Sequence, residues 1–113
     1  MALTTRRIGG VDVLALEGGL LLGQGEKDLF DAHSGLLDGG SRCLVVDLTG
    51  LRSIDSSGVG SLVVVAKRSA ERGAKVKLAV RPEGAVRRVL EVTCLDRAFE
   101  IYTDPESAAR SFA

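Results

Sequence analysis

The sequence predicts a single domain of the α/β class, in which helices pack on a mixed β-sheet. The chain has 113 residues, a length at which one domain buries roughly two thirds of the surface that its unfolded chain exposes. Short apolar runs rich in β-branched residues alternate with segments of helical periodicity, which is the pattern of an α/β domain. The predicted order is strand-strand-helix-strand-helix-strand-helix-strand-helix, and residues 1–113 are taken as one domain.

The first part of the chain predicts a hairpin and a helix. Residues 3–8 and 11–17 flank Gly9-Gly10, a dipeptide that suits a two-residue turn because both positions tolerate positive φ. The glycine-rich residues 18–25 are expected to form a loop over one end of the sheet. Leu20, Leu21 and Leu22 cannot all enter the core from one short segment, so at least one should be exposed. A helix is expected from Glu26 to Asp38, where Gly39-Gly40 ends it.

The middle of the chain predicts a buried strand followed by a long helix. The strand covers Cys43 to Leu48 and is bounded by Thr49-Gly50. The helix is ended by Gly73 and carries an apolar stripe at helical spacing, formed by Val59, Leu62, Val63, Ala66 and Ala70. Its outward face is expected to present Ser61, Val65, Arg68 and Arg72, with Val64 beside them.

The last third predicts two further strands, each followed by a helix. Residues 75–80 alternate at period two, as a half-exposed strand does. Pro82 suits the first turn of a third helix, which carries Val86, Val89 and Leu90 at helical spacing. Residues 98–102 form a short strand, and Asp104 caps a closing helix that runs through Phe112.

Charge and cysteine usage narrow the possible function classes. Fifteen basic and fifteen acidic residues cancel, so the net charge does not attract nucleic acid or an anionic membrane, and no direct nucleic-acid binding is expected. Residues 67–88 hold eight basic residues against two acidic ones, a solvated flank or a surface for an acidic protein. Cys43 and Cys94 lie in apolar surroundings without zinc or redox spacing and should be reduced. No apolar run is long enough to span a membrane, and a cytoplasmic location is expected.

No enzyme motif is complete. A G-x-S-x-G elbow fails because position 55 is Asp, and the only imidazole, His33, falls on the apolar side of a helix, where a packed core or rim residue is expected. The remaining feature is Asp55-Ser56-Ser57-Gly58, which lies between the end of a predicted strand and the start of a predicted helix. A serine at this junction either caps the helix or leaves its hydroxyl free to react, since unsatisfied N–H groups there favour an anion. Both uses stay open on local grounds.

The residues around this motif resemble a known family. From Leu44 to Leu62 the chain reads Leu-Val-Val-Asp-Leu-Thr-Gly-Leu-Arg-Ser-Ile-Asp-Ser-Ser-Gly-Val-Gly-Ser-Leu, which is similar to the signature of STAS domains, the fold of bacterial anti-sigma factor antagonists. The likeness continues through residues 73–78, 86–90 and 99–102. The resemblance implies that Ser57 is phosphorylated by an anti-sigma factor that is itself a serine kinase. Many members carry an acidic residue where this chain has Leu20-Leu21-Leu22, so a carboxylate from that place is not expected here.

The resemblance therefore implies a non-enzymatic switch module without a cofactor of its own. The unphosphorylated protein would bind the anti-sigma factor/serine kinase, which supplies ATP and magnesium, and a serine phosphatase would restore it. The expected partner-binding residues are Asp55, Ser56, Ser57, Gly58, Ser61, Val64, Val65, Arg68, Leu21 and Leu22. Two alternatives stay open: a scaffolding STAS subunit of a stress-sensing or transporter complex, and a module that binds a nucleotide or another small ligand.

Overall fold

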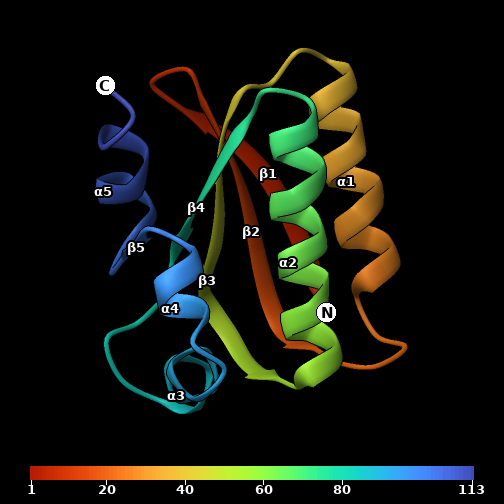
Figure 1. Cartoon of the computed structure of the whole chain (residues 1–113), viewed down its shortest axis with the longest axis vertical. Coiled ribbons are helices and arrows are strands. Elements are labelled where there is room, and N and C mark those ends of the chain that lie inside the picture. The colour runs from red at the N-terminus through yellow and green to blue at the C-terminus, as the bar shows by residue number, and fades with distance from the viewer.

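The computed structural model describes all residues from 1 to 113 and confirms the α/β fold (Figure 1). Its elements follow the predicted order, with one additional short helix. They are β1 (Ala2–Ile8), β2 (Val11–Leu20), α1 (Glu26–Asp38), β3 (Cys43–Ile54), α2 (Ser56–Glu71), β4 (Lys75–Ala79), α3 (Ala85–Val92), α4 (Leu95–Ala98), β5 (Ile101–Tyr102) and α5 (Pro105–Arg110).

The five strands form one sheet in the order β1-β2-β3-β4-β5. β1 is antiparallel to β2, and the other three pairings are parallel. The predicted hairpin turn is confirmed, because Gly9 and Gly10 both have positive φ, at 54° and 83°, as the turn between two such strands requires.

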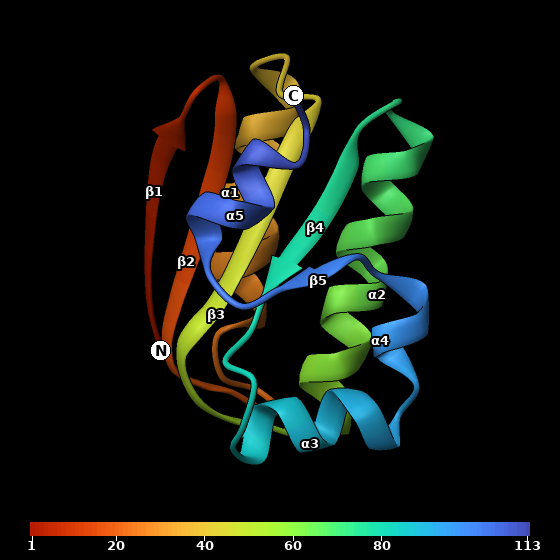
Figure 2. The same ribbon diagram turned by 90° about the vertical axis from the view of Figure 1, so that its left-hand side faces the viewer.

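Helices cover both faces of the sheet. α1 and α2 lie side by side on one face, and α5 lies on the opposite face over the central strands (Figures 1 and 2). α3 sits beneath the end of the sheet at which β3 runs into α2 (Figure 1). Since β3 is covered on both faces, its residues from Leu44 to Leu48 are all buried, as expected of a parallel strand inside an α/β sheet.

The two longest strands extend further than predicted. β2 continues through Leu20, and its last residues pair with β3 from Leu51 to Ile54. The expectation of a loop from residue 18 is therefore wrong for Gly18, Gly19 and Leu20, and Thr49-Gly50 does not end β3. The register between β2 and β3 shifts between Ala15 and Glu17 and again between Gly18 and Gly19. Pairing with another strand holds the last residues of β2 in place, and the local composition of the sequence does not predict such pairing.

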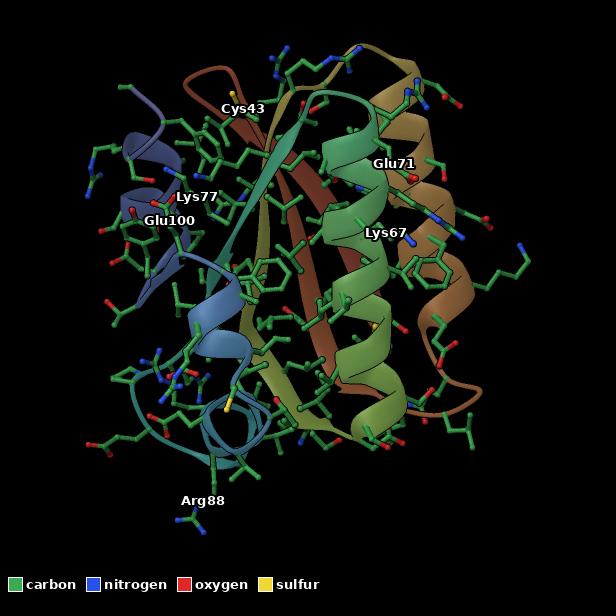
Figure 3. The ribbon with its side chains drawn as sticks, viewed as in Figure 1. Cys43, Lys67, Glu71, Lys77, Arg88 and Glu100 are labelled. Carbon is green, nitrogen blue, oxygen red and sulfur yellow. The ribbon has the colours of Figure 1, made fainter.

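The prediction of a half-exposed strand at residues 75–80 is wrong, because α5 covers the second face of β4. Lys77 is only 5% exposed. Its ammonium donates to the carbonyl and the hydroxyl oxygen of Ser111, at 3.2 and 2.8 Å, and lies 4.2 Å from the centre of the Phe112 ring. Glu100 lies 3.4 Å away and supplies the opposite charge that a buried lysine requires (Figure 3).

The segment around α3 differs from the prediction in three ways. Pro82 lies in the loop before α3 rather than in its first turn, and the predicted strand at residues 98–102 is reduced to Ile101–Tyr102. The short helix α4 occupies part of the space between them. Cys94 is exposed rather than set in apolar surroundings, and its φ of 59° makes it the only non-glycine residue with positive φ. It therefore takes the left-handed position that glycine commonly fills after a helix.

His33 is a packed core residue, as predicted. It is fully buried between α1 and α2, where its Nε2 shares a 2.7 Å hydrogen bond with the Ser69 hydroxyl. Its Nδ1 has no hydrogen-bond partner within the protein. Burial, and to a smaller extent the Arg68 guanidinium, holds the pKa of His33 below its ordinary value.

This burial makes the domain less stable in mild acid. Because the pKa of His33 is lower in the folded state, its contribution is complete above the unfolded pKa and is lost as the pH falls. We expect the free energy of unfolding to fall as the pH drops below about 6.5, with a slope of at most about 1.4 kcal/mol per pH unit. Urea unfolding followed by circular dichroism measures it. His33→Gln should remove the slope, because His33 is the only histidine; an unchanged slope in that variant would contradict the assignment.

Candidate functional site

The Asp-Ser-Ser-Gly motif lies where β3 ends and α2 begins. Asp55 is the N-cap of α2, with extended backbone angles, and its Oδ1 accepts a 2.9 Å hydrogen bond from the backbone N–H of Gly58. The sequence left open whether a serine of the motif caps the helix. In the structure the cap is the carboxylate of Asp55 and not a serine hydroxyl. The hydroxyls of Ser56 and Ser57 remain available for other contacts.

Asp55 also ties the β2–α1 connection to the start of α2. Its Oδ2 accepts a 2.9 Å hydrogen bond from the backbone N–H of Leu22. Donation from the N–H groups of Leu22 and Gly58 lowers the pKa of this carboxyl below its ordinary value. Asp55 is therefore anionic at neutral pH and fixes the connection at the N-terminus of α2.

Gly58 allows α2 to approach the end of β2 closely. It is buried, and a Cβ at this position would stand 2.2 Å from the carbonyl oxygen of Leu20 and 2.7 Å from Cγ1 of Ile54. Its expected role in direct partner binding is therefore corrected: Gly58 sets the helix position from beneath the surface.

The two serines differ in their surroundings. Ser56 is exposed, whereas Ser57 is half-buried and its hydroxyl donates a hydrogen bond to Oε1 of Glu26, the first residue of α1. The sequence reasoning expected no carboxylate from the leucine segment and overlooked Glu26. Only the packing of α1 beside α2 brings this side chain, 31 residues upstream, to the motif.

The three leucines before α1 have different exposures. Leu20 is fully buried and Leu22 is 79% exposed, which confirms that at least one of them faces solvent. Leu21 is half-buried and forms an isolated antiparallel bridge with Gln24. The connection between β2 and α1 thus presents one large apolar side chain beside the cap of α2.

The predicted outward face of α2 is wrong in part. Val65 and Ser61 are only 1% and 3% exposed, because α1 packs against this side of the helix, so neither can contact a partner directly. Val64 is half-buried and Arg68 is exposed. The Arg68 guanidinium stacks over the Phe30 ring of α1, 4.8 Å from its centre. Val64 and Arg68 remain surface candidates.

The site shows no arrangement for metal binding or for a catalytic triad. No group of three or more His, Cys, Asp or Glu side chains is placed to hold a metal ion. The imidazole of His33 is engaged with Ser69, rather than with a motif serine. None of the helices combines the length and the apolar character needed to cross a membrane.

Solved structures share this fold. An anti-sigma factor antagonist from Mycobacterium paratuberculosis superimposes with a TM-score of 0.85 at 21% identity, covering 97% of this chain and 92% of the other. The phosphorylated form of the Bacillus cell fate determinant SpoIIAA gives 0.71 at 20% identity, covering 97% and 99%. A sulfate transporter family protein from Wolinella succinogenes gives 0.65 at 16% identity, covering 93% and 85%.

The sequence itself identifies the family. No curated protein sequence matches significantly. The family model of the STAS domain matches residues 2–108, which span all the strands and the helices α1 to α4 together with most of α5. The chain therefore belongs to the STAS domain family, and its fold resembles that of anti-sigma factor antagonists.

Proposed function

We propose that this protein is an anti-sigma factor antagonist that binds an anti-sigma factor with serine kinase activity and is released when Ser57 is phosphorylated. The observation that carries the proposal is the state of the Ser57 hydroxyl. Ser57 lies in the first turn of α2, its hydroxyl is not used as the helix cap, and the residue is half-buried. The structural similarity to an anti-sigma factor antagonist and to a phosphorylated SpoIIAA supports this assignment.

The proposed docking surface surrounds Ser57. It contains the exposed or half-buried members of the predicted set, which are Asp55, Ser56, Ser57, Val64, Arg68, Leu21 and Leu22. The buried residues Gly58, Ser61 and Val65 support it from below. A partner that covers this surface desolvates the Ser57 hydroxyl at small cost, because the hydroxyl is neutral and hydrogen-bonded.

A phosphate at Ser57 raises the cost of covering this surface. It adds about −1.5 to −2 charges at neutral pH, next to the ionised Asp55. The N-terminus of α2 tolerates an anion, so the domain stays folded, but burying an unpaired dianion against a partner costs several kcal/mol. A serine phosphatase then regenerates the binding form.

Ser57 variants test this switch. We expect Ser57→Ala to bind the anti-sigma factor constitutively and to resist phosphorylation, and Ser57→Asp to fold normally while binding at least about a hundredfold more weakly. The partner can be captured with Ser57→Ala, and affinities follow by calorimetry. Mass spectrometry after incubation with the kinase and ATP locates the phosphate, with Ser56→Ala as the matched control. Phosphate on Ser56 alone, or full binding by Ser57→Asp, would overturn the proposal.

The exposed leucine should contribute to the same interface. Leu22 is 79% exposed and its backbone is anchored to Asp55, so it offers apolar area in a fixed position. We expect Leu22→Ser to weaken partner binding by about tenfold, or about 1.4 kcal/mol, without changing stability. Val92→Ser, at an equally exposed valine on α3, is the control and should leave binding unchanged. Equal affinities of both variants and the wild type would mean that Leu22 merely covers the end of the sheet.

A scaffolding role is the second candidate. The similarity to a sulfate transporter family protein from Wolinella succinogenes favours it, since the same fold occurs there. Purification of the native protein separates the two functions: co-purification with a sigma-regulating kinase supports the switch, and recovery within a large stable assembly supports the scaffold.

A further inference from the structure

Phosphorylation at Ser57 would act on a contact between two helix N-termini. Ser57 lies in the first turn of α2, and its hydroxyl donates to Glu26 at the start of α1. A carboxylate only accepts hydrogen bonds, so this contact depends on the hydroxyl proton of Ser57.

Phosphoryl transfer removes that proton. The Oγ–P bond forms as the bond between the β- and γ-phosphates of kinase-bound ATP breaks, ADP leaves, and the hydroxyl proton passes to solvent. The new dianionic group offers only acceptor oxygens to Glu26. What was a donor–acceptor pair becomes a contact between two anions, which repel each other.

The surroundings do not neutralise this repulsion. The backbone N–H of Gly58 already donates its hydrogen bond to Asp55 and is not free for a phosphate. Asp28 adds a further acid in the first turn of α1. Lys27, which follows Glu26 in the sequence, is paired with Asp31 at 2.6 Å. A phosphate on Ser57 therefore lies beside the carboxylates of Glu26 and Asp55, and Lys27 is not free to neutralise them.

The movement of Glu26 has a defined consequence for the chain. Glu26 follows directly on the segment from Leu21 to Gly25, which connects β2 to α1 and carries the exposed Leu22. Hydrogen bonds from the N–H of Leu22 to Asp55 and from the N–H of Leu29 to the carbonyl oxygen of Gly25 tie this segment to its surroundings, and Leu21 pairs with Gln24 inside it. A displacement of Glu26 would therefore act directly on this segment.

We propose that Glu26 converts phosphorylation of Ser57 into a displacement of the Leu21–Gly25 segment, so that the phosphate disrupts the docking surface by moving Leu22 as well as by its own charge. The inference rests on the proposed function of Ser57 as phosphate acceptor. It assigns to Glu26 a positioning role, because Glu26 holds the hydroxyl before transfer and opposes the phosphate afterwards.

Unfolding equilibria of the isolated protein test this role without kinase or partner. Phosphoserine is introduced at position 57 during translation, in the wild-type background and in Glu26→Gln, whose amide can donate to a phosphate. We expect phosphoserine to lower the folding equilibrium constant at least about tenfold, or about 1.4 kcal/mol, with Glu26 present, and less than about threefold in Glu26→Gln. Asp28→Gln removes a neighbouring acid that makes no contact with Ser57, and should retain the tenfold loss.

Amide chemical shifts supply a second readout that needs no Glu26 variant. In the otherwise wild-type chain, phosphoserine at position 57 should shift the amide resonances of Leu22 and Gln24 and speed hydrogen exchange at Leu22. Equal stability losses with Glu26 and with Gln at position 26, or unmoved Leu22 and Gln24 amides, would overturn the inference. A Glu26-dependent effect in a protein whose partner binding ignores phosphorylation would instead uphold the displacement caused by Glu26 and refute the proposed switch.

Discussion

Replacing Gly58 by alanine is expected to destabilise the protein by about 3 kcal/mol or more. The added methyl group would stand 2.2 Å from the carbonyl oxygen of Leu20 and 2.7 Å from Ile54 Cγ1. The first of these atoms is backbone inside a paired strand and cannot rotate away, so α2 must shift from the sheet. The same shift would displace Asp55, which caps the helix and holds Leu22, so the docking surface should be lost along with stability.

Gly60 provides the matched control on the same helix. A Cβ at Gly60 would meet nothing within 4 Å, and the residue is exposed. Gly60→Ala should therefore leave the free energy of unfolding unchanged or raise it by up to about 1 kcal/mol, the difference in helix propensity. Urea denaturation of both variants measures the contrast. A Gly58→Ala protein as stable as Gly60→Ala would show that α2 does not approach β2 as closely as the structure has it.

The features that sequence predicts well are those set by neighbouring residues. The turn at Gly9-Gly10 and the helix from Glu26 to Asp38 were both located correctly, because glycine pairs and helical periodicity are local signals. The Asp-Ser-Ser-Gly motif was also placed correctly at a strand-to-helix junction.

The features that sequence misses depend on contacts between distant segments. The extension of β2 through Leu20 is held by pairing with β3, and the burial of Lys77 comes from α5 and from Ser111, which is 34 residues further on. Glu26 reaches Ser57 only because two helices pack side by side. None of these contacts produces a regular spacing of residues that could be recognised in the sequence. The candidate site was therefore found through its motif, while the carboxylate that contacts its serine was not.

The sequence predicts the wrong orientation of α2 about its own axis. The predicted apolar stripe placed Val63 inside and Val65 outside, whereas the structure leaves Val63 45% exposed and Val65 1% exposed. A run of three valines at positions 63–65 fits more than one orientation. The choice is made by α1, which buries the side of α2 that carries Ser61, Val65 and Ser69. Two buried serines, Ser61 and Ser69, lie on this side, and a hydrophobicity pattern counts them as polar.

Val65→Asp should consequently unfold the protein or destabilise it by about 3–5 kcal/mol, since it buries a carboxylate that has no partner. A loss of that size takes up much of the 5–15 kcal/mol that stabilises a typical domain. Val63→Asp, two residues earlier in the same helix, should cost less than about 1 kcal/mol because its side chain reaches solvent. Circular dichroism and urea titration of the two variants give the comparison directly. A folded Val65→Asp protein with weakened partner binding would show that Val65 is a surface residue and would refute the packing of α1 against α2. The expected result is that Val65→Asp loses its structure while Val63→Asp stays folded.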